Sequence, residues 1–224
     1  AMYLPQYHEV KENNEWWGEG FTEWVNVKKA MPLFKGHKQP NIPTEELGYY
    51  NLLDDEIRRK QAALAKEAGI DAFCYWHYWF GNGRELLEAP FKKTLADKSN
   101  DFGFCLGWAN ESWKRKQWAK DGIGDVTLIE QLYLGYSDDE AHFYAYLEAF
   151  KDERYVRING KPLFLIYRPF DHPNIKEFIT TWNKLARHGP NKEVVGIPTY
   201  PSPYGLPHMF EESSVAPMRK VFAG

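Results

Sequence analysis

The sequence has few cysteines, no long apolar run and no excess of basic residues, and each scarcity argues against a class of protein. Cys74 and Cys105 are the only cysteines among 224 residues, and both lie in apolar runs typical of buried strands, so a disulfide scaffold is not indicated. No stretch of about eighteen apolar residues is present, which argues against a membrane span. A net charge of −3 with interspersed signs argues against a nucleic-acid partner.

Length and composition predict one folded domain. With 43% hydrophobic residues, a chain of this length can bury one sizeable core, and we expect a single domain over residues 1–224. The start at Ala1-Met2-Tyr3-Leu4 does not look like a signal peptide. We therefore expect a cytoplasmic protein, unless an upstream leader has been removed.

Short apolar runs alternate with helical patterns along the chain. Strands buried on both faces are predicted at residues 2–5, 71–79, 102–108, 161–168 and 194–199. Helix boundary signals lie at Asp54 and Gly69, at a capping box over residues 137–140, and at Pro173 and Gly189. Asn159-Gly160 predicts a two-residue hairpin turn.

This alternation predicts an α/β fold with a parallel sheet. Polar and aromatic residues gather at several strand ends, and no glycine-rich phosphate loop follows the first strand, so a (β/α)8 TIM-like barrel is favoured over an open sheet. Only about five of eight strands are recognisable. Residues 201–224 contain four prolines and two glycines without a strand period. We expect the C-terminal units to be missing or divergent after about residue 200.

Aromatic side chains are abundant, at 17% of residues with nine tryptophans. One group follows a predicted strand at residues 108–113, the end where a barrel carries its chemistry. There Asn110 precedes Glu111, so that an amide can bind a sugar hydroxyl while an acid protonates or attacks. Trp108 and Trp113 supply flat apolar surfaces for a sugar ring. The alternative for Glu111 is a loop acid paired with Lys114 or Arg115.

Glu23 is the second candidate carboxylate. It lies in a long connection after the first strand, and long loops in compact domains are commonly functional. The alternative is an acid in the first turn of a helix capped by Thr22, and the sequence leaves both interpretations open. Further candidate substrate-binding residues are polar or aromatic side chains at strand ends or in turn-rich loops: Gln6, His8, Trp24, His37, His77, Trp79, Tyr167 and Arg168.

Two of these further candidates have specific alternatives. Arg168 suits an acidic sugar or a phosphate, or else a salt bridge with Asp171. His77 suits a sugar hydroxyl, or else a structural role with a backbone carbonyl as its partner.

The seven histidines show no His-Glu-x-x-His spacing, and no Gly-x-Ser-x-Gly elbow occurs. We therefore predict no metal and no cofactor, and paired carboxylates are the best-supported chemistry.

Six motifs occur in the order found in the WbsX family, which is similar to glycoside hydrolase family 99. They are YLPQYH at 3–8, WWGEGFTEW at 16–24, KGHKQP at 35–40, GIDAFCYWHYWF at 69–80, WANESW at 108–113 and GKPLFLIYRP at 160–169. The resemblance extends to about residue 189. It implies a (β/α)8 barrel acting in bacterial polysaccharide metabolism.

The family is named as a glycosyltransferase of O-antigen or capsule loci, while the hydrolase relatives cleave α-mannosidic linkages within glycans. For those relatives the resemblance implies retention through a 1,2-anhydro sugar, with one carboxylate removing the 2-hydroxyl proton and another protonating the leaving oxygen. That route uses neither a metal nor a nucleotide.

The sequence departs from the family near its end. Family members carry an Asn-Glu-Trp-x-Glu-Gly motif whose glutamates resemble a catalytic pair, followed by Leu-Glu-Pro. Nothing in residues 190–224 matches it, since Glu211 and Glu212 lack the flanking Trp and Asn. The resemblance therefore supports Glu111 more as part of the substrate site than as the catalytic acid.

Three hypotheses follow. The first is an enzyme that breaks or transfers a glycosidic bond in an oligosaccharide or polysaccharide, with Glu111 and Glu23 as acid or base. The second is a sugar-binding remnant without activity. The third is a partial barrel that associates with itself through its open sheet edge.

Overall fold

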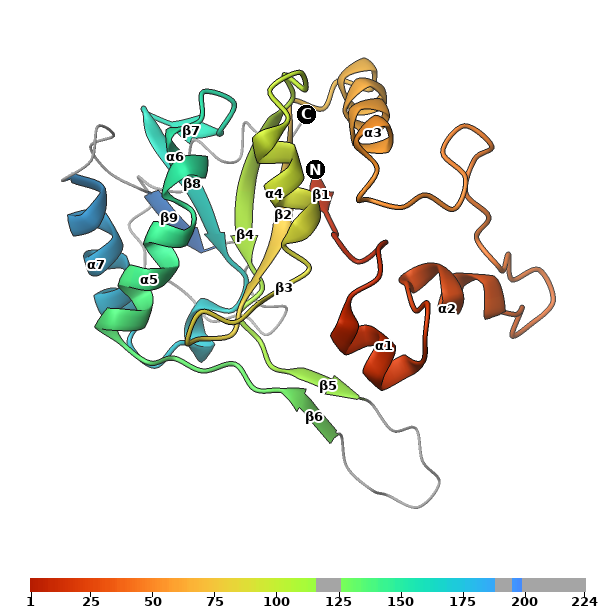
Figure 1. The fold of residues 1–224 in the computed structure, drawn as a ribbon, viewed down its shortest axis with the longest axis horizontal. Coiled ribbons are helices and arrows are strands. Elements are labelled where there is room, and N and C mark those ends of the chain that lie inside the picture. Colours follow the sequence, from red (N-terminus) through yellow and green to blue (C-terminus); the bar gives the residue numbers. More distant parts are fainter. Residues whose placement is uncertain (116–125, 188–194, 199–224) are drawn as a thin grey trace.

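A computed structural model describes residues 1–115, 126–187 and 195–198 (Figure 1). Its centre is a sheet of five parallel strands in the order β1-β2-β4-β8-β9. The strands are β1 (Met2–Tyr3), β2 (Ala72–Trp79), β4 (Gly103–Trp108), β8 (Lys161–Ile166) and β9 (Val195–Pro198). Each of the five predicted strands is confirmed, with ends trimmed by one or two residues.

Helices occupy the connections between these strands, as a parallel sheet requires. They are α1 (Lys11–Trp17), α2 (Glu23–Lys29), α3 (Asp55–Glu67), α4 (Ala89–Ala96), α5 (Tyr136–Ala145), α6 (Leu147–Lys151) and α7 (Ile175–Arg187). The Asp54 side chain caps α3 by accepting a hydrogen bond from the Glu56 amide at 2.9 Å, and Gly69 follows the helix with φ +77°.

One helix start differs from the prediction. The capping box over residues 137–140 is wrong, because α5 begins at Tyr136 and Gly135 takes the N-cap position with φ +79°. The glycine adopts a positive φ that an L side chain rarely takes, and this turn sets the helix start ahead of Ser137.

Short antiparallel strands pair with two strands of the sheet. β7 (Arg157–Ile158) pairs with β8 across Asn159-Gly160, whose φ angles of 52° and 78° fit a type I′ turn, so the predicted hairpin is confirmed. β3 (Glu85–Leu86) pairs with β2. A separate hairpin of β5 (Trp113–Arg115) and β6 (Val126–Ile129) projects from one end of the molecule and was not predicted (Figure 1).

The two faces of the sheet have different surroundings. Alternation along β2 directs Tyr75, His77 and Trp79 toward the side that α4, α5 and α7 cover, which we call the helix face. Residues 74, 76 and 78 lie on the opposite side, the far face, together with Gly107 of β4. A Cβ on Gly107 would lie 3.0 Å from the Cys74 Sγ and 3.4 Å from the Trp76 ring. The two-residue period thus separates the aromatic residues of β2 into two sets.

These features confirm the predicted α/β class and the mostly parallel sheet. The single domain over residues 1–224 stays a prediction. None of the helices in the described ranges combines the length and the apolar character needed to cross a bilayer.

Candidate active site

Tyr78 is a tyrosine whose ionisation depends on three of the predicted site residues. It is the second-to-last residue of β2, on the far face, and is buried. Burial raises the pKa of its hydroxyl, and the charges of Glu111 and then Glu23 raise it further, while a hydrogen bond from Gln6 opposes the rise. Gln6 after β1, Glu23 at the start of α2 and Glu111 after β4 therefore all influence the ionisation of one tyrosine.

Glu111 is ion-paired at the exposed rim of the site. Its Oε2 lies 3.5 Å from Nη1 of Arg168, and Nε of Arg168 lies 2.5 Å from Oδ2 of Asp171. The partner of Glu111 is therefore Arg168 from the neighbouring strand end, and Lys114 and Arg115 do not take that role. The alternative suggested for Arg168, a salt bridge with Asp171, is present. The Glu111 side chain is 42% exposed, so a substrate can reach it.

Asn110 fixes the position of Arg168. Its Oδ1 accepts a hydrogen bond from the Arg168 amide at 2.7 Å, and its Nδ2 donates to the Arg168 carbonyl at 2.8 Å and to the Tyr133 hydroxyl at 3.0 Å. The residue is completely buried. Both amide hydrogens are used, so Asn110 is placed to join the loops after β4 and β8 rather than to bind a sugar hydroxyl.

Glu23 is the first residue of α2, so the first-turn position weighed from the sequence is where it lies. Thr22 takes the N-cap position without a side-chain capping hydrogen bond. Burial and, to a lesser extent, the Glu23 charge raise the pKa of Tyr7. Next to it the Trp24 ring packs at a tilt against the Tyr7 ring, 4.3 Å between centroids, and donates its Nε1–H to the Tyr50 carbonyl at 2.8 Å. These rings form one wall beside Glu23.

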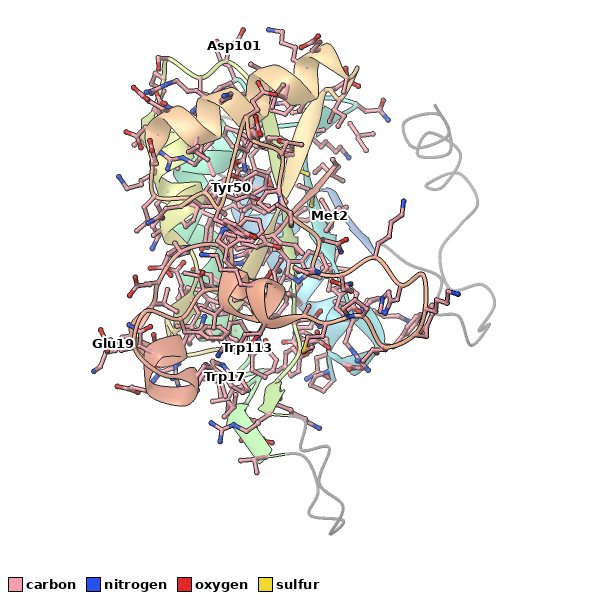
Figure 2. The ribbon with its side chains drawn as sticks, turned by 90° about the vertical axis from the view of Figure 1, so that its right-hand side faces the viewer. Met2, Trp17, Glu19, Tyr50, Asp101 and Trp113 are labelled. Carbon is pink, nitrogen blue, oxygen red and sulfur yellow. The ribbon has the colours of Figure 1, made fainter. Side chains whose placement is uncertain are left out.

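Trp113 begins a second aromatic wall. Its ring lies 5.0 Å from that of Tyr78 and 5.9 Å from that of Trp16. Arg115 donates to the Trp16 carbonyl at 2.9 Å and holds its guanidinium 5.0 Å from the Trp17 ring, which ties the hairpin to α1. Figure 2 shows Trp17 and Trp113 close together at the end from which the hairpin projects, opposite Asp101, which precedes β4.

Tyr167, at the end of β8, adds an aromatic ring to the far face. It meets Trp76 edge to face at 5.0 Å, and both rings are partly exposed. The far-face aromatic residues and Glu111 therefore come from the ends of three neighbouring strands, β2, β4 and β8.

Three predicted residues, His77, Trp79 and Trp108, lie on the helix face instead. The Nε2 atoms of His77 and His142 are 2.6 Å apart, and Trp79 stacks on His142 at 4.7 Å. Trp108 donates its Nε1–H to the Trp79 carbonyl at 3.0 Å. These three side chains and His142 are at most 5% exposed, and their contacts hold α5 against the sheet.

Burial controls the charge state of this histidine pair. It lowers the pKa of His77 to about 3, and it lowers the pKa of His142 well below its usual value. Both rings are therefore neutral near pH 7, and one donates a hydrogen bond to the other.

Two other predicted histidines are not brought to Tyr78. His8 is buried after β1, where burial lowers its pKa against the smaller opposing effects of the Pro5 carbonyl and Glu88. His37 makes its contacts within its own loop: its ring stacks on Phe34 at 4.7 Å, and its Nδ1 accepts from the Leu33 amide at 3.2 Å.

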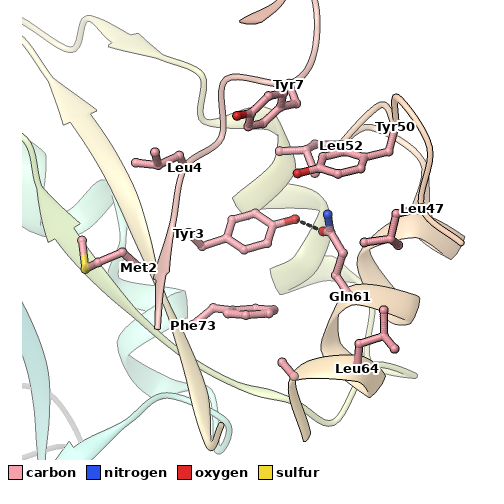
Figure 3. Close-up of a pocket in the computed structure, with 11 residues that line it drawn as sticks. Met2, Tyr3, Leu4, Tyr7, Leu47, Tyr50, Leu52, Gln61, Leu64 and Phe73 are labelled. Atoms are coloured by element: carbon pink, nitrogen blue, oxygen red, sulfur yellow. Dashed lines mark hydrogen bonds between the residues drawn. The ribbon is translucent and has the colours of Figure 1, made fainter. Parts of the chain in front are cut away.

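A cavity of about 380 Å³ lies beside the site, between β1 and α3 (Figure 3). Tyr3 crosses it and donates its hydroxyl hydrogen to Gln61 Oε1 at 2.6 Å. Tyr7 lines one edge of the cavity and packs against Trp24, the residue after Glu23. None of the residues lining the cavity is acidic, so it offers binding surface but no acid or base. Among the described residues, no three His, Cys, Asp or Glu side chains form a group suited to a metal ion.

Sequence reasoning missed Tyr78, Tyr133 and His142. The signal for Tyr78 was available, because the two-residue period of β2 puts it on the face opposite His77 and Trp79. Nothing in the sequence indicated that Tyr133 and His142 would pair with Asn110 and His77.

Comparisons with known proteins give a family and a set of relatives. The family described as Glycosyltransferase WbsX matches residues 1–199. The uncharacterized protein WxcX from two strains of Xanthomonas campestris pv. campestris is 43% identical over 188 residues, which cover 84% of this chain and 26% of that protein. The chain thus spans about a quarter of the length of the curated relatives it matches.

Among solved structures, the GH99 endo-alpha-mannosidase from Bacteroides thetaiotaomicron is 15% identical, with a TM-score of 0.47 over 99% of this chain and 57% of that one. A glycoside hydrolase-like protein is 13% identical, with a TM-score of 0.40 over 72% of this chain and 49% of that one.

Proposed function

Because the chain belongs to the Glycosyltransferase WbsX family, we propose that it forms part of a carbohydrate-active enzyme that hydrolyses or transfers a glycosidic bond in a bacterial oligosaccharide or polysaccharide. The observation that carries the proposal is the group of side chains at the carboxyl ends of β2, β4 and β8, where the Trp113 ring lies 5.0 Å from the Tyr78 ring and Glu111 lies 3.5 Å from Arg168. This is the end of an α/β sheet where ligands bind.

The residues present divide the task between chemistry and binding. Glycosidic bond cleavage uses two carboxyl groups, one as acid and one as base or nucleophile, and Glu111 and Glu23 are the pair that this site offers. Trp113 and Tyr167 supply aromatic surface for the apolar face of a sugar ring. Arg168, beside Glu111 and 48% exposed, is placed to donate hydrogen bonds to substrate oxygens.

Substitution of the carboxylates tests the proposal. With α-linked oligosaccharides as substrates, we expect Glu111→Gln and Glu23→Gln each to lower kcat/KM by about 100-fold or more. Glu67→Gln is the matched control, since Glu67 is an exposed acid at the end of α3. Products are counted by mass spectrometry. Turnover that survives Glu111→Gln at the control rate would remove Glu111 from the mechanism.

The second candidate function is sugar binding without turnover. The ion pair with Arg168 occupies Glu111, the carboxylate that would act as acid or base, and this favours a binding role. Calorimetry that records glycan binding, together with an absence of product by mass spectrometry, would support this alternative. Any turnover by the chain would exclude it.

A further inference from the structure

The loop after α2 exposes several large apolar side chains. Met31, Leu33, Phe34 and Ile42 are 74%, 84%, 67% and 74% exposed. Single exposed apolar residues are common on protein surfaces, but this loop exposes four large ones within twelve residues. Such a loop marks a surface that is covered by something else.

The tip of this loop, residues 31–34, is held in place by His37. The His37 amide donates to the Phe34 carbonyl at 3.0 Å, and the His37 Nδ1 accepts from the Leu33 amide at 3.2 Å. The Phe34 and His37 rings stack with an interplanar angle of 9°. Gly36 permits the turn with φ +89°. The apolar side chains are thus presented outward by a hydrogen-bonded turn.

The charge around the tip has one sign. Residues 24–44 contain four lysines and no aspartate or glutamate. Lys28 packs over the Tyr49 ring at 4.3 Å. Within the described ranges Lys29, Lys35 and Lys38 are exposed and make no ion pair. Lysine is depleted from the centres of protein interfaces, whereas basic residues beside apolar ones suit a surface of anionic lipid.

We propose that the 31–34 tip inserts into the surface of an anionic lipid bilayer. Leu33 and Phe34 enter the boundary between head groups and acyl chains, and Lys35 and Lys38 lie against lipid phosphates. The two lysines account for the preference for anionic lipid, and Leu33 and Phe34 account for insertion below the head groups. The inference depends on the loop alone and is independent of the proposed enzyme activity.

Sedimentation of the purified chain with vesicles tests this proposal. We expect binding to vesicles of phosphatidylcholine mixed with phosphatidylglycerol, and much weaker binding to phosphatidylcholine alone. Leu33→Ser and Phe34→Ser should each weaken binding about tenfold. Lys35→Gln and Lys38→Gln should each weaken it about fivefold at low salt and very little at high salt.

The matched control removes exposed apolar side chains elsewhere. Leu134→Ser and Phe170→Ser alter residues that are 54% and 59% exposed, and binding should be unchanged. Equal binding of the tip and control variants would overturn the proposal, as would equal binding to both kinds of vesicle. Absence of vesicle binding would also overturn it. If light scattering then showed a dimer that Leu33→Ser abolishes, the tip would be assigned to a second copy of the chain.

Discussion

Acid should weaken the fold through the buried histidine pair. Burial holds the pKa of His77 at about 3, against 6.5 for an exposed histidine, so the folded state keeps the ring neutral where the unfolded state binds a proton. The contribution of the neutral ring is complete above pH 6.5 and is lost as the pH falls from 6.5 toward 3. Lowering the pH to 5 therefore favours unfolding.

The size of the effect follows from that interval. At pH 5 the unfolded chain gains about 2 kcal/mol from protonating His77, because each pH unit below 6.5 is worth about 1.4 kcal/mol. Asp139 has the opposite effect. Burial raises its pKa to about 6, so its protonation between pH 7.5 and pH 5 stabilises the folded state by about 1 kcal/mol. His172, with its pKa lowered to about 4 by burial, adds to the loss.

Because Asp139 and His172 affect stability over the same pH range as His77, the test compares two proteins at two pH values. Urea denaturation followed by tryptophan fluorescence gives the free energy of unfolding of the wild type and of His77→Gln at pH 7.5 and pH 5. We expect the wild type to lose about 2 kcal/mol more than the variant on acidification, whatever the stability of the variant at pH 7.5. An equal loss in both proteins would refute the assignment to His77.

Three further substitutions probe contacts that hold the fold, two at the amino-terminal end of β4 and one beside Glu111. Arg154 donates hydrogen bonds to four backbone carbonyls after and within α4 and pairs with a carboxylate, so Arg154→Lys should cost about 2–4 kcal/mol in urea denaturation. A Cβ at Gly103 would lie 2.8 Å from the Asp71 carbonyl oxygen, so Gly103→Ala should cost about 1–3 kcal/mol by the same measurement. Asn110→Ala leaves the Arg168 amide unpaired, and we expect a loss of about 2–3 kcal/mol in thermal unfolding.

Each of these predictions has a clear contrary result. A fully stable Arg154→Lys would mean that one ammonium group replaces the five-donor guanidinium. An unchanged midpoint for Gly103→Ala would mean that the start of β4 shifts freely. Asn110→Ala with wild-type stability would remove Asn110 as the link between the loops after β4 and β8.

The parallel sheet was predictable because each strand is a short apolar run bounded by turn residues. Asn159-Gly160 is equally local, since both residues accept the positive φ that a type I′ turn requires. The β5 and β6 strands were not predictable, because three and four residues carry no clear period and their pairing joins segments separated along the chain. Local sequence patterns thus predicted the strands of the sheet, but they did not predict the pairing of β5 with β6.

The roles of the predicted site residues stay predictions, but the structure shows where their side chains lie. Glu111 and Glu23 were selected for their positions after a strand and in a long loop, and the charges of both raise the pKa of Tyr78. His77 and Trp79 were selected for their residue type at a strand end. Their direction depends on which face α5 and α7 cover, and that follows from the packing of Phe143, Phe178 and Trp182 rather than from the local sequence.

The alternation of β2 also bears on how such a site can change. Substitutions at Trp76 and Tyr78 alter the far face, while Tyr75, His77 and Trp79 keep the contacts that hold the helices. The far face can therefore change at the partly exposed Trp76 while the odd-numbered residues keep their contacts, whereas Tyr78 is itself buried in a hydrophobic cluster. A deletion of one residue within 72–79 has the opposite effect, because it exchanges the two sets and disrupts both faces of the sheet together.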